Sequence, residues 1–106
     1  MRNEIVVSKM VKYIEKIQKY TNTLTYSEFA EQEMIVEACI FNLSQLGELS
    51  NKVDKEFQEN HPEIPWRSLY GLRNRIVHDY EGVNLALVWE IIENDLSDLK
   101  KMLKQL

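Results

Sequence analysis

The side chains best suited to chemistry in this chain gather in one short segment of its second half. They are Arg67, Arg73, Arg75, His78 and Tyr80. An arginine is a permanent cation that can bind a phosphate through two hydrogen bonds, and a histidine exchanges a proton near neutral pH. These two residue types suffice to cleave RNA without a metal. The ribose 2′-hydroxyl attacks the adjacent phosphorus, the histidine moves a proton, and the arginine stabilises the charge that develops on the phosphoryl oxygens.

The same segment is positively charged within an acidic chain. Residues 66–80 contain three arginines and one acid, Asp79, a formal charge of +2, whereas the whole chain of 106 residues has a formal charge of −4. A cationic island in an acidic protein predicts that an anion binds there, and the acidic total argues against indiscriminate nucleic-acid binding over the whole surface. We expect weak, salt-sensitive engagement of short single-stranded RNA.

The spacing of these residues raises a geometric problem. At about 100° per residue, Arg73 and Tyr80 share one face of a helix, and Asn74 and His78 share another. Arg73 and His78 are about 140° apart, so a straight helix does not direct both at one atom. Three arrangements would solve this: the helix ends or bulges before His78, the Arg73 side chain curls round, or a second copy of the protein completes the site.

Other catalytic constellations are missing from the sequence. His61 and His78 are far apart, Cys39 is alone, and there is no Gly-rich phosphate loop or serine nucleophile elbow. We therefore expect neither a metal nor a cofactor. The single cysteine allows no internal disulfide, and no apolar run approaches the roughly 20 residues that span a bilayer. With no signal peptide at the start, these features predict a cytoplasmic protein without membrane contact.

Four helices are predicted to position the segment, as an all-α, up-and-down four-helix bundle that forms a single domain over residues 1–106. The expected helices span residues 3–20, about 27–58, 66–79 and 84–106. The apolar residues recur every three or four positions, as in amphipathic helices whose inner faces form a core. These are Val6, Met10, Ile14 and Ile17 in the first helix, Ile35, Cys39, Leu43 (or Phe41), Leu46, Leu49, Val53 and Phe57 in the second, and Leu85, Val88, Trp89, Ile92, Leu96, Leu99, Leu103 and Leu106 in the last. Asp95 and Asp98 lie off this last stripe.

Local signals mark the ends of these helices. Asn3 and Asn84 are expected N-caps, and Thr25 with Glu28 has the spacing of a capping box. Pro62 and Pro65 separate the second and third helices, and Gly82 can supply a left-handed C-cap. Gly47 lies inside the second helix, where it costs about 1 kcal/mol relative to alanine, so we expect a compensating close approach of another helix or a kink.

The motif Arg73-Asn74-x-x-x-His78-x-Tyr80 resembles the R-x4-H-x-Y motif of the HepT-like family of HEPN domains. Gln45-Leu46-Gly47-Glu48, Pro65-Trp66, Gly82 and Val88-Trp89 also match the pattern of that family, so the resemblance covers most of the chain. Members of the family are all-helical. They are usually the toxin of a type VII-like toxin–antitoxin system whose antitoxin is a minimal nucleotidyltransferase.

The resemblance implies a role for each matching residue. Arg73 and His78 would be the catalytic pair of a metal-independent endoribonuclease that acts on single-stranded RNA and not on DNA. Asn74 would orient His78 or the phosphate, and Arg75 would be a supporting cation. Glu48 lies in the matching stretch of the second helix, where it is either near the cleft or simply a surface acid.

The resemblance also implies two partners. Family members form homodimers whose motifs face each other across a cleft, which agrees with the geometric argument above. Tyr80 matches the tyrosine that the nucleotidyltransferase modifies with AMP, which silences the toxin. An adenylyl group would block an RNA phosphate by its bulk and its negative charge.

Two alternatives stay open. The chain could be a non-catalytic helical partner of a nucleotidyltransferase that binds its nucleotide or substrate. Arg73 and Arg75 would then hold phosphates and His78 would transfer no proton. It could also be a dimeric structural domain in which the motif serves packing.

Overall fold

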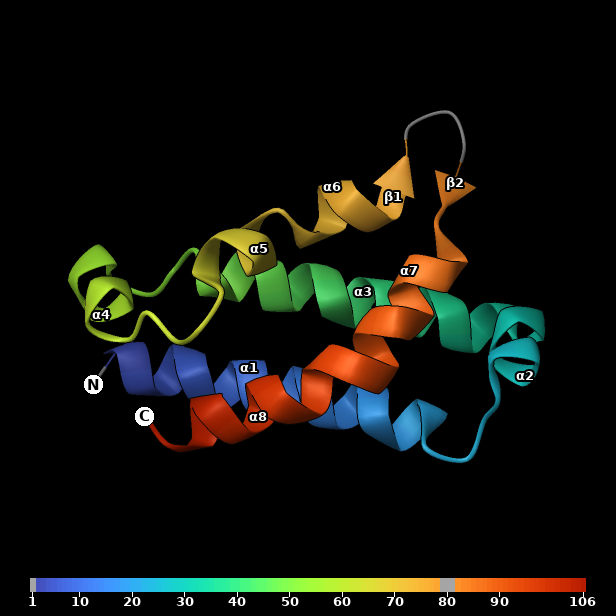
Figure 1. The fold of residues 1–106 in the computed structure, drawn as a ribbon, viewed down its shortest axis with the longest axis horizontal. Helices are drawn as coiled ribbons and strands as arrows, with labels where there is room; N and C mark the ends of the chain where they lie inside the picture. The colour runs from blue at the N-terminus through green and yellow to red at the C-terminus, as the bar shows by residue number, and fades with distance from the viewer. Residues whose placement is uncertain (1, 79–81) are drawn as a thin grey trace.

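The computed structural model describes residues 2–78 and 82–106. The longest element is the first helix, α1 (Arg2–Thr21). It packs chiefly against α3 (Glu33–Ser50) and α8 (Leu96–Lys104). Figure 1 shows that α1 and α3 run in opposite directions and that α8 returns beside α1 to the end of the molecule where the chain begins. The part of the chain that the structure describes is mostly helical, as expected from the sequence.

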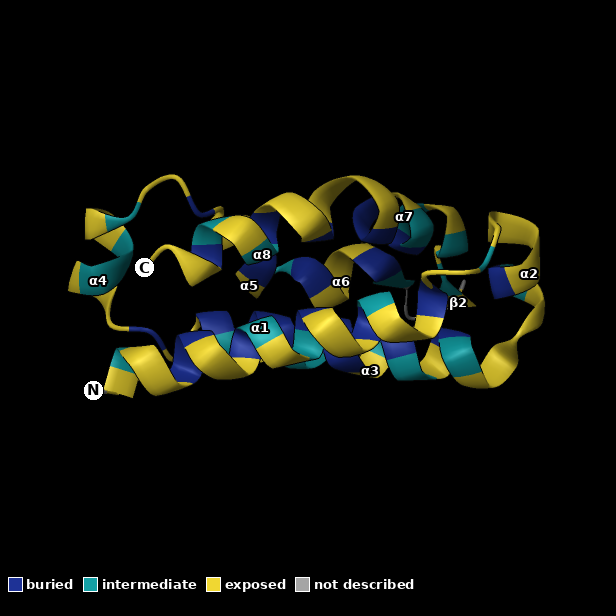
Figure 2. Cartoon of the chain, turned by 90° about the horizontal axis from the view of Figure 1, so that it is seen from below, coloured by how far each residue is buried: buried dark blue, intermediate teal, exposed yellow. Residues whose placement is uncertain are grey.

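The buried face of α1 is the one that its periodicity predicted. Val6, Met10, Ile14 and Ile17 are all buried, and Thr21 closes the stripe by donating a hydrogen bond to the Ile17 carbonyl oxygen at 2.9 Å. Figure 2 shows the exposed residues of α1 on the outer side of the molecule and its buried residues facing the other helices. This stripe and the apolar faces of α3 and α8 share one hydrophobic core.

The second predicted helix is wrong as a single element. It is broken into α2 (Tyr26–Glu31), α3 and α4 (Lys55–Asn60). At the first break, Gln32 leaves the helical region with φ −103° and ψ 86°. The change of direction buries Phe29 completely and brings its ring centroid to 5.0 Å from that of Trp89. The free energy gained by burying this aromatic side chain outweighs the free energy lost by interrupting the helix at Gln32.

The second break involves the start of α1. The Asn3 side chain accepts a hydrogen bond from the Asp54 backbone N–H at 3.1 Å and donates one to the Asp54 carboxylate at 3.3 Å. Asn3 is therefore inside α1 and is not its N-cap, which corrects that expectation. Its amide instead fastens the turn between α3 and α4 to the first turn of α1.

Two other predicted caps are confirmed. Thr25 and Glu28 form a reciprocal capping box at the start of α2, with hydrogen bonds of 2.9 and 3.2 Å. The Asn84 side chain accepts a hydrogen bond from the Leu87 N–H at 3.1 Å at the start of α7 (Leu85–Glu90). Such bonds satisfy backbone donors that have no partner within the helix.

Gly47 has the compensating contact that was expected. A Cβ atom at this position would lie 2.6 Å from the carbonyl oxygen of Leu69, which belongs to α5 (Trp66–Tyr70). Glycine therefore lets the backbone of α5 rest directly on α3. This contact sets the position of the segment that carries the arginines.

The last predicted helix contains an irregular turn. After α7 the chain forms one π-helical turn, η1 (Ile91–Asp95), before it continues as α8. Val88, Ile92, Leu96, Leu99 and Leu103 are buried as expected, whereas Leu106 is exposed. Among the described residues, no helix is both long enough and apolar enough to cross a membrane.

Candidate active site

The third predicted helix ends earlier than expected. After α5, Gly71 interrupts the helix, and α6 (Leu72–Ile76) adds little more than one turn. Val77 has extended backbone angles, φ −114° and ψ 121°, so the helix does not reach residue 79. His78 instead lies in β1 (Val77–His78).

A short antiparallel pairing holds this strand. β1 pairs with β2 (Gly82–Val83), and His78 lies opposite Gly82. Gly82 has φ 79°, so its predicted left-handed conformation is confirmed, but it serves the strand pair and does not cap a helix. The Asn84 N–H donates to the Ile76 carbonyl oxygen at 2.9 Å and closes the pair where α6 ends.

This early end of α6 removes the continuous helix on which the geometric problem of the motif was based. Arg73 and His78 were about 140° apart on a continuous helix, but they now belong to a helix and a strand. The first of the three arrangements considered above, in which the helix ends before His78, is the one that the backbone adopts.

Arg73 and Asn74 are exposed on α6, while Leu72 and Ile76 on the same short helix are buried and anchor it on α3. No carboxylate among the described residues forms a salt bridge with Arg73. The buried side of α6 thus fixes the helix, and its other side exposes a guanidinium group and an amide, which are hydrogen-bond donors suited to a phosphate.

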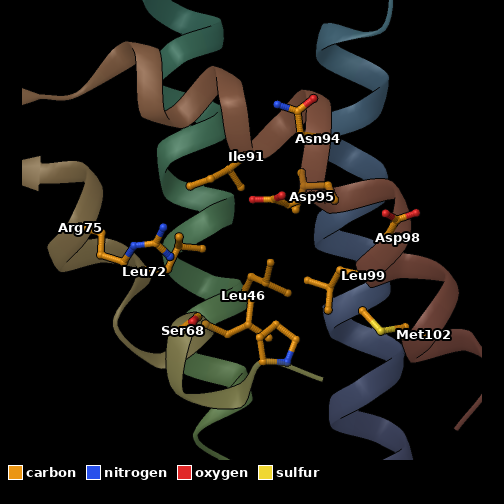
Figure 3. Close-up of a pocket in the computed structure, with 13 residues that line it drawn as sticks. Leu46, Ser68, Leu72, Arg75, Ile91, Asn94, Asp95, Asp98, Leu99 and Met102 are labelled. Atoms are coloured by element: carbon orange, nitrogen blue, oxygen red, sulfur yellow. The ribbon is translucent and has the colours of Figure 1, made fainter. Parts of the chain in front are cut away.

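The three arginines of the cationic segment do not line one common cavity. Arg75 lines a cavity of about 370 Å³ between the α5–α6 segment and the η1–α8 segment (Figure 3). Arg67 lines a separate hollow of about 320 Å³ with Tyr70 and Asn51, and Arg73 lines neither. The three arginines are close in sequence, but their positive charges therefore lie on different parts of the protein surface.

Sequence reasoning missed the acidic wall of the Arg75 cavity. Asp95 and Asp98, taken as part of the outer face of the last helix, line it opposite the α5–α6 segment. Their spacing of three residues, continued at Met102, was the available signal, because such residues share a helix face. Nothing in the sequence pairs that face with Arg75.

The other candidate residues fall in different places. Glu48 is exposed on α3, directly after Gly47, and makes no salt bridge with the described cations. His61 ends α4, where its ring lies 4.5 Å from that of Phe57. Because α4 lies at one end of the molecule in Figure 1 and β1 lies well away from it, beyond α5 and α6, His61 is not part of the candidate site. Tyr80, the expected modification site, lies outside the described residues. For His78 the structure describes the position of the backbone.

Cys39 is a packing residue. It is fully buried on α3, and this burial raises the pKa of its thiol to about 11. A thiol with such a pKa carries almost no thiolate near neutral pH, so Cys39 is not a nucleophile. This agrees with the absence of an evident partner for it in the sequence.

The fold and the motif together define a class of protein: a mostly helical chain that exposes an arginine on a short helix and places a histidine five residues later on a strand. The chain belongs to the family described as Ribonuclease HepT-like, which it matches over residues 10–106. The resemblance seen in the sequence is thereby confirmed.

Individual relatives cover most of the chain. It is 36% identical over 83 residues to a protein of Methanocaldococcus jannaschii named "Putative RNase MJ1380", a match covering 78% of this chain and 76% of that protein. It is 31% identical over 93 residues to a protein of Thermococcus cleftensis named "Probable ribonuclease HepT", a match covering 88% and 84% of the two chains. No solved structure matches the chain significantly.

Proposed function

We propose that this protein is a metal-independent endoribonuclease that cleaves single-stranded RNA and acts as the toxin of a type VII-like toxin–antitoxin pair. The observation that carries the proposal is the end of α6 at Ile76, which leaves Arg73 exposed on a helix and moves His78 onto a strand. Family membership and the ribonuclease names of its relatives support the same activity.

The reaction follows from the chemistry of the two side chains. His78 takes the proton from the ribose 2′-hydroxyl as that oxygen attacks the adjacent phosphorus. Arg73 donates hydrogen bonds to the non-bridging oxygens as negative charge builds on them. The bond from phosphorus to the 5′-oxygen breaks, and that oxygen takes up a proton. The products are a 2′,3′-cyclic phosphate and a 5′-hydroxyl.

This reaction favours a site built from two copies of the chain. In a concerted reaction, one imidazole accepts the proton from the 2′-oxygen while a second, protonated imidazole gives a proton to the leaving oxygen. Two His78 side chains, one from each subunit, would meet both needs. Met34 and Phe41 are 84% and 59% exposed on α3 and lie seven residues apart on one face. We propose that this apolar pair is part of the face that a second copy of the chain covers.

Regulation by a minimal nucleotidyltransferase antitoxin belongs to the same proposal. Tyr80 lies two residues after His78, so an adenylyl group on its hydroxyl would add bulk and negative charge beside the catalytic motif. Co-expression with such an enzyme is expected to raise the intact mass of the wild type by one adenylyl group and to leave Tyr80→Phe unmodified. An unchanged mass for both proteins would remove this part of the proposal.

The activity is tested with purified protein and a single-stranded RNA. We expect wild type to cleave, and Arg73→Ala and His78→Ala to lose activity by at least about a hundredfold, since a positioned acid–base group contributes roughly 10²–10⁴ in rate. His61→Ala is the matched control, because this second histidine ends α4, which lies far from β1 in Figure 1, and it should retain activity. Equal cleavage by wild type and His78→Ala would refute the assignment.

A non-catalytic nucleotide-binding role is the second candidate. The observation that favours it is the cavity lined by Arg75, which is large enough for a small ligand. Nucleotide binding that survives His78→Ala, together with no RNA cleavage by the wild type, would decide for this role.

A further inference from the structure

The cavity beside Arg75 has walls of opposite charge. Arg75 enters it from α6, and in Figure 3 the Asp95 carboxylate points into it from η1 on the other side. Asp98 lies at its rim on α8. No salt bridge joins these side chains, so each retains hydrogen-bonding capacity toward a ligand.

The same cavity has an apolar lining between these walls. Leu46 of α3 lies deep in it, with Leu72 and Met102 on either side. Leu46 and Leu72 are buried, so this lining is part of the core and is held in place. A flat apolar ligand body would pack on these side chains, and a methionine sulfur also makes favourable contacts with aromatic rings.

The charges exclude simple ions as the intended ligand. A small anion attracted by Arg75 would face two carboxylates, and a metal cation attracted by Asp95 and Asp98 would face a guanidinium group. The arrangement instead suits a neutral, planar molecule with hydrogen-bond donors on one edge and acceptors on another. Nucleobases have this construction.

We propose that this cavity binds a guanine base. Guanine places N1–H and N2–H donors side by side, which a carboxylate can accept with both oxygens, and Asp95 would take that edge. Its O6 and N7 atoms are adjacent acceptors that match the two donors of an arginine, and Arg75 would take those. Adenine offers one amino group and no acceptor pair of this kind, so it satisfies only part of the site.

The π-helical turn explains why Asp95 faces the cavity. A π turn inserts an extra residue into a helix and changes which side chains share a face, and such turns are frequent at functional sites. Asn94 and Asp95 close this turn and line the cavity, whereas Glu93, which is exposed like them and belongs to the same turn, does not line it.

The position of the cavity relates it to RNA cleavage, and this step rests on the proposed function. Arg75 precedes His78 by three residues, so their Cα atoms are at most about 11 Å apart. We therefore place a guanine held by Arg75 within a few nucleotides of the cleaved phosphate. The cavity would thus select the sequence at which the RNA is cut.

Binding is tested with nucleoside monophosphates titrated into the His78→Ala variant, followed by NMR chemical-shift changes, so that no result depends on catalysis. We expect GMP to bind at least about tenfold more tightly than AMP, CMP or UMP, since one correct bidentate pair discriminates by about that factor or more. IMP lacks the N2 amino group and should bind with an intermediate affinity.

Two variants test the named contacts. Asp95→Asn replaces one of the two acceptor oxygens by an NH₂ group and should lower the ratio of GMP to AMP affinity by about tenfold, and Arg75→Gln should weaken GMP binding by at least about tenfold. Glu93→Gln changes the same charge in the same turn without touching the cavity, so it should bind GMP like the parent protein. Equal affinity for all four nucleotides, no binding at millimolar concentration, or an unchanged ratio in Asp95→Asn would overturn the proposal.

RNA cleavage is measured separately from GMP binding, so that the guanine cavity and the ribonuclease activity can be refuted independently. If the wild type cuts RNA without preference for guanine and binds GMP no better than AMP, the guanine cavity is refuted while the ribonuclease stands. If GMP binds selectively and no RNA is cut, the cavity stands and the ribonuclease is refuted.

Discussion

Gly47 has only a hydrogen atom as its side chain, and this determines how closely α3 and α5 approach each other. A Cβ atom there would lie 2.6 Å from the Leu69 carbonyl oxygen, and that oxygen belongs to backbone that cannot rotate away. Cys39, on the same helix, shows the opposite kind of constraint, because its whole side chain is enclosed. Both residues act through packing, and each has a measurable consequence.

Gly47→Ala should destabilise the protein although alanine favours a helix by about 1 kcal/mol. The added methyl group forces α5 away from α3, and overpacking of this kind costs about 1–3 kcal/mol. The control is Gly71→Ala, where the nearest atom to a new Cβ is 3.7 Å away, an ordinary contact. Thermal unfolding that gives equal melting temperatures for Gly47→Ala and wild type would contradict the close approach.

Cys39 should make stability fall at high pH. Its thiol has a pKa of about 11 when folded, above the ordinary value of 9.0 of an exposed thiol. The unfolded chain therefore loses this proton first as the pH rises, and stability drops between about pH 9 and 11 by at most about 3 kcal/mol. Below pH 9 the neutral Cys39 thiol makes its full contribution to the unfolding free energy. Cys39→Ala lacks it, so the difference in unfolding free energy between the two proteins should shrink over that interval; a constant difference would contradict this account.

At the scale of the element, the helices end where tertiary contacts require it. The spacing of apolar residues predicted the buried faces of α1 and α8 and most of α3, because periodicity reports which side faces the core. It could not predict the breaks at Gln32 and after Ser50, which depend on Phe29 meeting Trp89 and on Asn3 meeting Asp54. Those partners are separated by many residues, and no local pattern links them.

Asn3→Ala should loosen the connection between α3 and α4. The change removes two hydrogen bonds to Asp54, each worth about 1 kcal/mol or less at an exposed site. We expect a modest loss of stability and faster hydrogen exchange of the Asp54 amide. Asn22→Ala, an exposed asparagine in the turn after α1, should have neither effect. Unchanged exchange at Asp54 in Asn3→Ala would argue against the tether.

Gly82 should be replaceable by asparagine but not by alanine. Its φ of 79° is left-handed, which costs a residue with a side chain about 1–2 kcal/mol, less for asparagine. Among residues 2–78 and 82–106, no atom lies within 4 Å of a new Cβ, so the penalty expected from these residues is conformational and not steric. Gly82→Ala should lower both the melting temperature and RNA cleavage, since β2 pairs with the strand of His78, and Gly82→Asn should restore much of both. Equal behaviour of the two variants would contradict this reading.

At the scale of the whole molecule, the candidate site was partly predictable from sequence. The spacing of Arg73, Asn74 and His78 identified the motif, and the geometric conflict within a straight helix anticipated that the helix might not continue. Asp95 could not be predicted as a neighbour of Arg75, because they are twenty residues apart on different elements. They reach one cavity because α6 packs on α3, while α8, which continues from the η1 turn of Asp95, packs on α1.

The proposed homodimer is tested by its dependence on the exposed face of α3. Wild type should sediment as a dimer of 12.6 kDa chains at micromolar concentration. Phe41→Glu should shift it toward the monomer, since it places a charge in a face that the partner would cover. Lys101→Glu, which likewise introduces a glutamate but at an exposed position of α8, away from this face, is the control. A wild type that sediments only as a monomer would contradict the two-copy site.

The central claim is that Arg73 and His78 cleave RNA by attack of its own 2′-hydroxyl, without a metal. Identification of the product ends in the presence of excess EDTA tests it most directly. We predict 2′,3′-cyclic phosphate and 5′-hydroxyl ends from the wild type and no such ends from His78→Ala. Activity that requires a divalent metal, or ends that carry a 5′-phosphate, would contradict the account.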